Sequence, residues 1–210
     1  MTLKNIGNIP FKLSVLQSVF PDHTAITAKA KRLKDAGAII RLKPGLYVVS
    51  SVISGKRVNE FLVANHLHGP SYVSMQTALR YYGLIPEHVI EIISITPRLK
   101  KTFSNKISHF SYIHCSESYF PIGITSATDE DVSFLIATPE KALCDLVSYT
   151  PKLNLRYMSE IRTYLKEDLR MDREDIIGLN TEILRECADV GKKKTMINQL
   201  IKIIEYERNV

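Results

Sequence analysis

The sequence has no apolar run long enough to span a bilayer, few cysteines and, near its amino end, almost no acidic residues. A membrane-spanning helix needs roughly 20 apolar residues, and the longest apolar run, Val89–Ile95, is interrupted by Glu91. Residues 1–20 lack the apolar core and cleavage site of a signal peptide. The chain has three cysteines, so at least one has no internal partner, which favours a reducing compartment. We therefore expect a cytoplasmic protein that does not bind a membrane.

The shortage of acid is confined to the amino end of the chain. Residues 1–58 hold ten Lys and Arg against two acids, Asp22 and Asp35, and so carry a net charge of +8, whereas the whole chain of 210 residues carries +6. This concentration of positive charge favours a polyanionic partner, because each neutralised phosphate releases counterions. Nucleic acid is the partner that we expect.

A pattern of helix, basic helix and basic hairpin occupies the same part of the chain. Apolar spacing predicts a helix over Pro10–Phe20, and a basic helix follows, capped by Thr24 or Thr27. It extends to about Ala36 and is ended by Gly37. The remaining elements expected here are strands over Ala38–Leu42 and Leu46–Val49, with a linker over Ser50–Gly55. This order is that of a winged helix-turn-helix, which we place at residues 1–55.

In a helix-turn-helix the second helix enters the major groove of DNA and its first residues reach the bases. We expect Thr24, Thr27 and Lys31 to contact base edges, and Arg41 of the wing to enter a minor groove. The other cations of this region are expected to contact phosphates. The complete set of candidate DNA-binding residues is Lys12, Thr24, Thr27, Lys29, Lys31, Arg32, Lys34, Arg41 and Lys43.

Residues 58–210 predict a second domain that mixes helices and strands and ends in a helical part, so the fold class of the whole chain is α+β. Thr138-Pro139 predicts a helix start, with Thr as N-cap and Pro in the first turn. The other helices are expected over 59–67, 74–82, 156–168, 172–177, 180–189 and 192–207. Strands are expected over 89–95, 106–114, 122–125 and 133–137.

Three segments resemble the AbiEi antitoxin family of bacterial abortive-infection (phage-defence) systems, which are type IV toxin–antitoxin systems. They are Leu33–Tyr47, similar to that family's recognition helix and wing, Ser71–Leu84, similar to its Ser-x-x-Ala-Leu-x-x-x-Gly-Leu helix, and Ala137–Leu146, similar to its Thr-Pro-Glu-Lys-Ala-Leu-x-Asp signature. The resemblance covers roughly residues 10–150. It implies a winged helix that binds promoter DNA and represses its own operon, and a second domain that neutralises a nucleotidyltransferase-like toxin. It also implies DNA contacts by Thr27, Lys31, Arg32, Arg41 and Lys43.

Enzymatic signals are weak, and we expect neither catalytic activity, a metal nor another cofactor. Lys141 and Asp145 lie at i and i+4 and are expected to pair on the surface. His66 and His68 diverge on a helix, and His114-Cys115 lacks a second pair of metal ligands. Asp129-Glu130-Asp131 is expected in a polar turn. No phosphate-binding loop or nucleophile motif is present.

The sequence is compatible with several other functions. The basic face could bind an acidic toxin and no DNA, and a nuclease using Asp129 and Asp131 is a further class. The basic segment 98–106 is either part of the DNA footprint, a toxin contact or a solvated loop. The run Lys192–Lys194 is expected on a solvated face, and the last helix is expected to pack its apolar stripe in the core. The oligomeric state, monomer or dimer, is not determined by the sequence.

Overall fold

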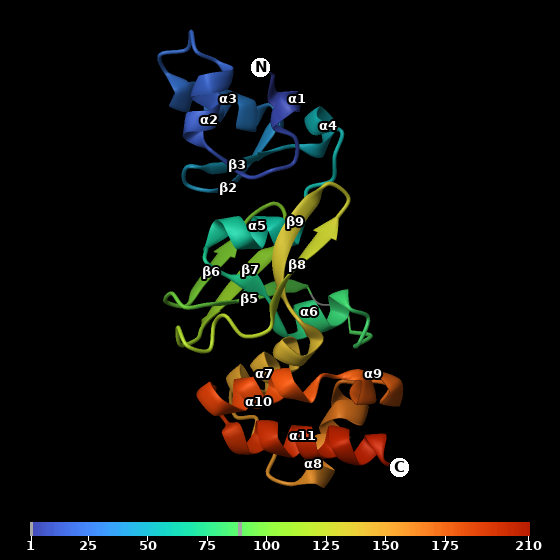
Figure 1. The fold of residues 1–210 in the computed structure, drawn as a ribbon. Coiled ribbons are helices and arrows are strands. Elements are labelled where there is room, and N and C mark those ends of the chain that lie inside the picture. Colours follow the sequence, from blue (N-terminus) through green and yellow to red (C-terminus); the bar gives the residue numbers. More distant parts are fainter. Residues whose placement is uncertain (1, 88–89) are drawn as a thin grey trace.

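The computed structural model describes residues 2–87 and 90–210, and the chain is of the α+β class. Its parts follow one another along the long axis of the molecule (Figure 1). An N-terminal unit comes first, a twisted sheet lies in the middle, and a group of helices formed by the carboxyl end of the chain lies at the other end. In the described part of the chain, no helix has both the length and the apolar character needed to cross a membrane.

The N-terminal unit, residues 2–55, combines a three-stranded antiparallel sheet in the order β1-β3-β2 with four short helices. Its small core contains Phe11, Leu16, Ala30, Ile39, Tyr47 and Val49. The elements are α1 (Leu3–Ile6), β1 (Phe11–Lys12), α2 (Leu13–Val19), α3 (Ile26–Asp35), β2 (Ile39–Lys43), β3 (Leu46–Val49) and α4 (Ser51–Ser54).

Three expectations about this unit are wrong in detail. The helix predicted from Pro10 begins at Leu13, because Phe11 and Lys12 pair with β3 as a strand. Neither Thr24 nor Thr27 caps α3: its N-cap is Ala25, with no side-chain hydrogen bond. The segment expected to be a linker forms α4, which ends at Gly55 in the left-handed conformation.

The end of α3 confirms the prediction made from Gly37. Gly37 has a φ of +70°, which glycine adopts at little cost. The Ala38 amide donates to the Leu33 carbonyl oxygen at 2.9 Å. This geometry reverses the chain directly into β2, so the hairpin lies beside α3.

The middle of the molecule is a six-stranded mixed sheet in the order β6-β7-β5-β4-β9-β8. β5 pairs in parallel with β7, and β4 pairs in parallel with β9, whereas the remaining pairs are antiparallel. Helix α5 (Glu60–Leu67) lies between the sheet and the N-terminal unit, while α6 (Met75–Tyr81) lies on the side of the carboxyl-terminal helices (Figure 1). The strands are β4 (Tyr72–Val73), β5 (Glu91–Thr96), β6 (Lys101–Ser104), β7 (His109–His114), β8 (Ile124–Asp129) and β9 (Val132–Ala137).

The predicted strands are confirmed with shifted bounds. The strand expected over 89–95 is β5, although its expected first residue, Val89, lies outside the described residues. The strand expected over 106–114 begins only at His109, and the one expected over 122–125 extends to Asp129. β4 and β6 were not predicted. β4 has two residues, and β6 is an exposed edge strand in which only Phe103 is half-buried, so neither shows an apolar alternation.

The carboxyl-terminal helices follow the prediction closely. Thr138 Oγ1 accepts a hydrogen bond from the Lys141 amide at 3.3 Å, and Pro139 occupies the first turn of the helix that follows. Met196, Leu200, Ile203 and Ile204 of the last helix are buried, as expected. The elements are α7 (Pro139–Tyr149), α8 (Met158–Thr163), the π-helical turn η1 (Tyr164–Asp168), α9 (Arg173–Gly178), α10 (Thr181–Val190) and α11 (Lys194–Arg208).

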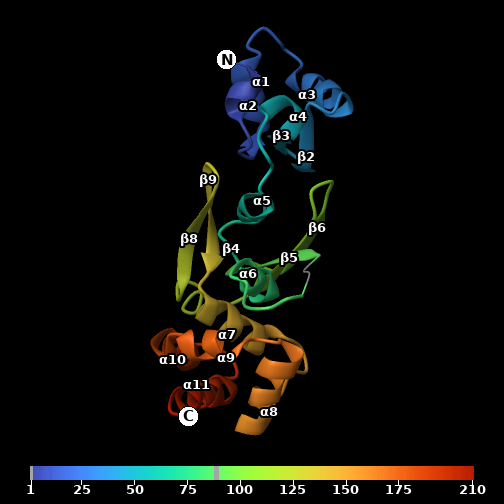
Figure 2. The same cartoon turned by 90° about the vertical axis from the view of Figure 1, so that its right-hand side faces the viewer.

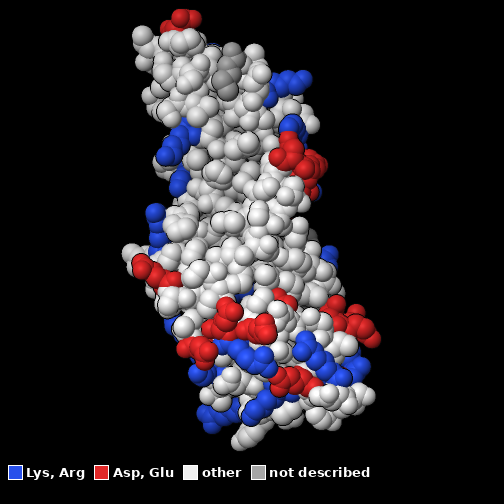
Figure 3. All heavy atoms as spheres, in the orientation of Figure 1, with Lys and Arg blue, Asp and Glu red and all other residues white. Residues whose placement is uncertain are grey.

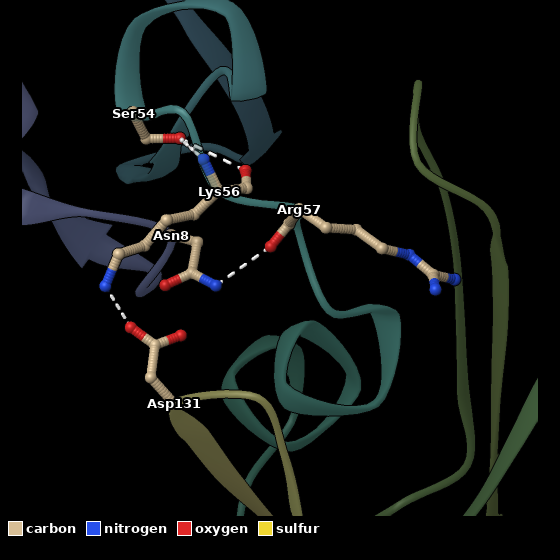
Figure 4. A network of polar contacts seen from close by, with 5 residues as sticks. All are labelled: Asn8, Ser54, Lys56, Arg57 and Asp131. Atoms are coloured by element: carbon tan, nitrogen blue, oxygen red, sulfur yellow. Dashed lines mark hydrogen bonds and ion pairs between the residues drawn. The ribbon is translucent and has the colours of Figure 1, made fainter.

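Two hairpins of the sheet extend toward the N-terminal unit, one on each side of the connecting chain (Figure 2). At the turn of the β8–β9 hairpin, Asp131 pairs with Lys56, and Asn8 Nδ2 donates to the Arg57 carbonyl oxygen at 2.8 Å (Figure 4). At the turn of the β6–β7 hairpin, Asn105 Nδ2 donates to the Leu42 carbonyl oxygen at 3.2 Å. Polar contacts therefore join the β6–β7 hairpin to the N-terminal unit, and the β8–β9 hairpin to the connecting chain that follows this unit.

Candidate nucleic-acid interface

The candidate interface is the exposed side of α3 together with the β2–β3 hairpin. Helix α3 packs into the N-terminal unit through Ile26, Ala30 and Leu33, which recur at helical spacing. Because these side chains fix which side of the helix faces inward, the opposite side is directed to solvent. Its exposed polar residues are Thr27, Lys31, Arg32, Lys34 and Asp35, and Thr24 is exposed just before the helix.

A hollow of about 520 Å³ lies between α3 and the hairpin, and we call it the α3–hairpin hollow. Lys31 and Arg41 come from different elements, yet both line this one hollow. This matters because a single stretch of DNA backbone can contact two cations only if they face the same side of the protein. The residues that line the hollow are Thr27, Ala28, Ala30, Lys31, Lys34, Arg41 and Tyr47.

Lys43 is directed away from this hollow, which differs from the expected phosphate contact of the wing. The pairing register of the hairpin shifts between Arg41 and Lys43, and Lys43 Nζ donates to the Leu67 carbonyl oxygen of α5 at 2.5 Å. Burial lowers the pKa of Lys43, and the neighbouring cations Lys101, Arg98 and Lys12 lower it further. Lys43 therefore joins the hairpin to α5.

The other candidate residues differ in how far they are engaged within the protein. Lys29 Nζ lies 4.6 Å from the centroid of the Phe20 ring, which holds it near the turn between α2 and α3. Lys34 Nζ lies 3.2 Å from Asp35 Oδ1, and this exposed ion pair contributes little to the stability of the fold. Lys12 is exposed on β1, outside the α3–hairpin hollow.

Lys141 and Asp145 are buried, so the expected surface pair is wrong. Neither side chain has any exposed surface, because α7 is covered by the sheet on one side and by the carboxyl-terminal helices on the other. Lys141 Nζ lies 3.6 Å from Asp145 Oδ1 and donates to the Tyr119 carbonyl oxygen at 3.0 Å. Ser74 Oγ donates to Asp145 Oδ2 at 2.6 Å. Burial raises the pKa of Asp145, and the nearby Lys141 opposes that rise.

Asp129 and Asp131, the acids considered for a nuclease, each bind a side chain from another segment of the chain. Asn59 Nδ2 donates to Asp129 Oδ2 at 2.8 Å, and Asp131 pairs with Lys56 (Figure 4). Both acids lie at the turn of the β8–β9 hairpin, where the sequence predicted a polar turn. Within residues 2–87 and 90–210, no group of three or more His, Cys, Asp or Glu residues is arranged to hold a metal ion.

Two basic features of the second region lie in surroundings that the sequence did not predict. A second hollow, of about 640 Å³, brings Lys101 of β6 and the adjacent Lys100 together with Lys192, and we call it the sheet–tail hollow. Lys193 was expected on a solvated face, but it donates to the carbonyl oxygens of Val147, Thr150 and Leu153 at 2.8–3.0 Å. It thereby satisfies carbonyl groups at the end of α7. The sequence identified both basic runs, but it did not predict which residues of the protein they would contact.

Charge is distributed unevenly over the surface. On the face shown in Figure 3, Lys and Arg are interleaved with Asp and Glu over the carboxyl-terminal helices, whereas most of the remaining surface is uncharged. On α3 the exposed charges are mostly positive, with Asp35 as the exception. Neither a protein-family model nor a curated protein matches the chain.

Proposed function

We propose that this protein is a DNA-binding transcriptional regulator that uses residues 1–55 as a winged helix-turn-helix. The element order supports this proposal: a helix, a strand, two helices and a β-hairpin follow one another, and β1 pairs beside the hairpin. In this arrangement α3 is the recognition helix and the β2–β3 hairpin is the wing. The shared position of Lys31 and Arg41 at the α3–hairpin hollow is the observation that carries the proposal.

The resemblance of three sequence segments to AbiEi antitoxins extends the proposal. On that basis the protein represses its own operon, and residues 58–210 neutralise a nucleotidyltransferase-like toxin. The winged helix and the remainder of the chain would then have separate partners, a promoter and a toxin. No catalytic step is part of this proposal.

A DNA-binding measurement with the double variant Lys31→Ala/Arg41→Ala tests the proposal. The probe is a duplex from the region upstream of the protein's own gene, titrated by fluorescence anisotropy at several salt concentrations. We expect the double variant to bind at least about tenfold more weakly, since a base or phosphate contact made by each cation is lost. Both side chains are exposed, so circular dichroism is expected to show an unchanged fold.

Lys202→Ala provides the matched control. Lys202 is an exposed lysine on α11, at the other end of the molecule, and its removal is expected to leave the affinity unchanged. If the wild-type protein binds this duplex with no dependence on salt, or if the double variant binds as tightly as the wild type, the proposal is wrong. Tight binding to an acidic protein in the absence of DNA binding would favour an interaction module instead.

A further inference from the structure

The turn of the β6–β7 hairpin lies against the N-terminal unit, and Asn105 joins the two. Asn105 Nδ2 donates to the Leu42 carbonyl oxygen of β2 at 3.2 Å, while Asn105 Oδ1 accepts from the Ile107 amide at 2.8 Å. The Asn105 side chain thus stabilises the turn internally and also joins it to β2. The hairpin lies on the same side of the molecule as α3 and β2 (Figure 2). Lys106, which follows Asn105 in the turn, is therefore placed beside β2.

A hollow of about 600 Å³ lies at this junction, and we call it the junction hollow. Lys34 of α3, Arg41 of β2 and Lys106 of the hairpin turn all line it. They come from three elements, and Lys106 is separated from Arg41 by the whole of α5, α6 and β5. Asp35 also lines the hollow and pairs with Lys34, so three cations face a single acid.

Ser50 supplies a separate indication of a ligand in the same place. It lines the junction hollow and is 6% exposed. Its hydroxyl has no hydrogen-bond partner among the residues that the structure describes. A buried hydroxyl without a partner is costly, and a phosphate in the hollow that reaches the Ser50 hydroxyl would supply the missing acceptor.

We infer that Lys106, with Lys34, Arg41 and Ser50, forms a phosphate-binding site through which the β6–β7 hairpin extends the DNA interface beyond the winged helix. The inference rests on the proposed function, because the ligand is a backbone phosphate of bound duplex DNA. Lys34 and Arg41 belong to both the junction hollow and the α3–hairpin hollow. A DNA backbone that follows α3 therefore reaches the junction hollow without leaving the protein surface. The continuity of the two hollows favours DNA over an acidic protein as the ligand.

The salt dependence of DNA binding by the variant Lys106→Ala tests the inference. The probe is a fluorescein-labelled duplex of scrambled sequence, because a phosphate contact acts on any sequence. Each phosphate neutralised adds about 0.9 to the slope of log K against log salt. Loss of Lys106 is expected to reduce the magnitude of that slope by about 0.9 and to weaken binding roughly five- to tenfold near 0.1 M salt.

Lys100→Ala is the matched control, since Lys100 belongs to the same basic segment and is exposed but lines the sheet–tail hollow. It is expected to keep the wild-type slope. The variant Ser50→Ala is expected to weaken binding while leaving the slope unchanged, because a neutral donor releases no counterion. Circular dichroism and thermal melting confirm that each variant is folded.

The possible outcomes separate this inference from the proposed function. If the wild type binds the duplex and Lys31→Ala/Arg41→Ala weakens it, but Lys106→Ala has the wild-type slope, the site at the junction hollow is refuted and the winged helix stands. If Lys100→Ala lowers the slope as much as Lys106→Ala, the effect is one of general charge and the inference is also refuted. If the wild type itself does not bind duplex DNA, both fail together.

Discussion

Lys141 and Asp145 form a buried ion pair at i and i+4 of α7, and the consequences of removing one partner can be predicted. The variant Asp145→Asn keeps an acceptor for Ser74 Oγ but leaves the Lys141 ammonium without a counter-charge inside the protein. We expect it to lower the free energy of unfolding by about 3–5 kcal/mol, as removal of one partner of a buried pair does. Urea unfolding followed by circular dichroism measures this loss.

The double variant Lys141→Met/Asp145→Leu is the comparison for that measurement. Replacing both charges by apolar side chains of similar size is expected to cost far less than the single change, because neither desolvated charge remains. An Asp145→Asn variant as stable as the wild type would show that the pair contributes no stabilising charge interaction. The structure also explains the polar residues of the Thr-Pro-Glu-Lys-Ala-Leu-x-Asp segment. Thr138 caps α7, whereas Glu140 accepts from the Asn180 amide at 2.9 Å, and Lys141 and Asp145 each bond to another segment.

Helix α11 is joined to three other elements through one residue, Glu207. This side chain is 5% exposed, and its carboxylate lies 3.0 Å from Arg162, 3.3 Å from Lys166 and 3.2 Å from Arg173. Burial alone would raise the pKa of Glu207, but the three cations lower it below its ordinary value of 4.5. A depressed pKa in the folded state gives stability that is present above pH 4.5 and is lost as the pH falls through the folded pKa.

The variant Glu207→Gln is therefore expected to be less stable than the wild type at pH 7, by about 1–3 kcal/mol. The difference is expected to shrink as the pH falls below about 4.5, because the wild-type carboxylate then becomes protonated. Thermal melts across this pH range measure both effects. Glu205→Gln is the control: Glu205 pairs with Arg185 at the exposed surface, where a pair contributes less than about 1 kcal/mol. A stability difference for Glu207→Gln that does not change with pH would contradict the prediction.

Among the elements, those with a strong local signal were predictable from the sequence and those made by tertiary pairing were not. Thr138-Pro139 and Gly37 fix a helix start and a helix end through their own backbone chemistry, and both were placed correctly. β6 has no apolar alternation and exists because β7 lies beside it. Burial of Lys141 was not predicted, because helical periodicity cannot show that α7 is covered on both sides. Lys106 and Arg41 line one hollow only because the β6–β7 hairpin reaches β2, and no local pattern encodes this contact.

At the scale of the whole molecule, the β2–β3 hairpin of the N-terminal unit belongs to two cores at once. Ile39, Tyr47 and Val49 pack in the small core of the unit, whereas Leu42, Leu46 and Val48 pack in the large core that contains α5 and the sheet. Lys43 and Asn105 add polar contacts across the same boundary. The proposed DNA interface that includes Lys106 requires this fixed relation, since the hairpin turn would otherwise move independently of α3.

We expect the N-terminal unit and the remainder to unfold together as a consequence of this shared packing. Differential scanning calorimetry should show one transition, and Leu42→Ala should lower it because a buried leucine reduced to alanine costs about 2–5 kcal/mol. Leu16→Ala is the informative comparison: Leu16 is fully buried but lies only in the small core. If the two parts are coupled, Leu16→Ala lowers the same single transition. Two transitions, of which Leu16→Ala shifts only one, would show that the N-terminal unit unfolds separately. The apolar contacts of the β2–β3 hairpin with α5 would then be too weak to couple the two parts.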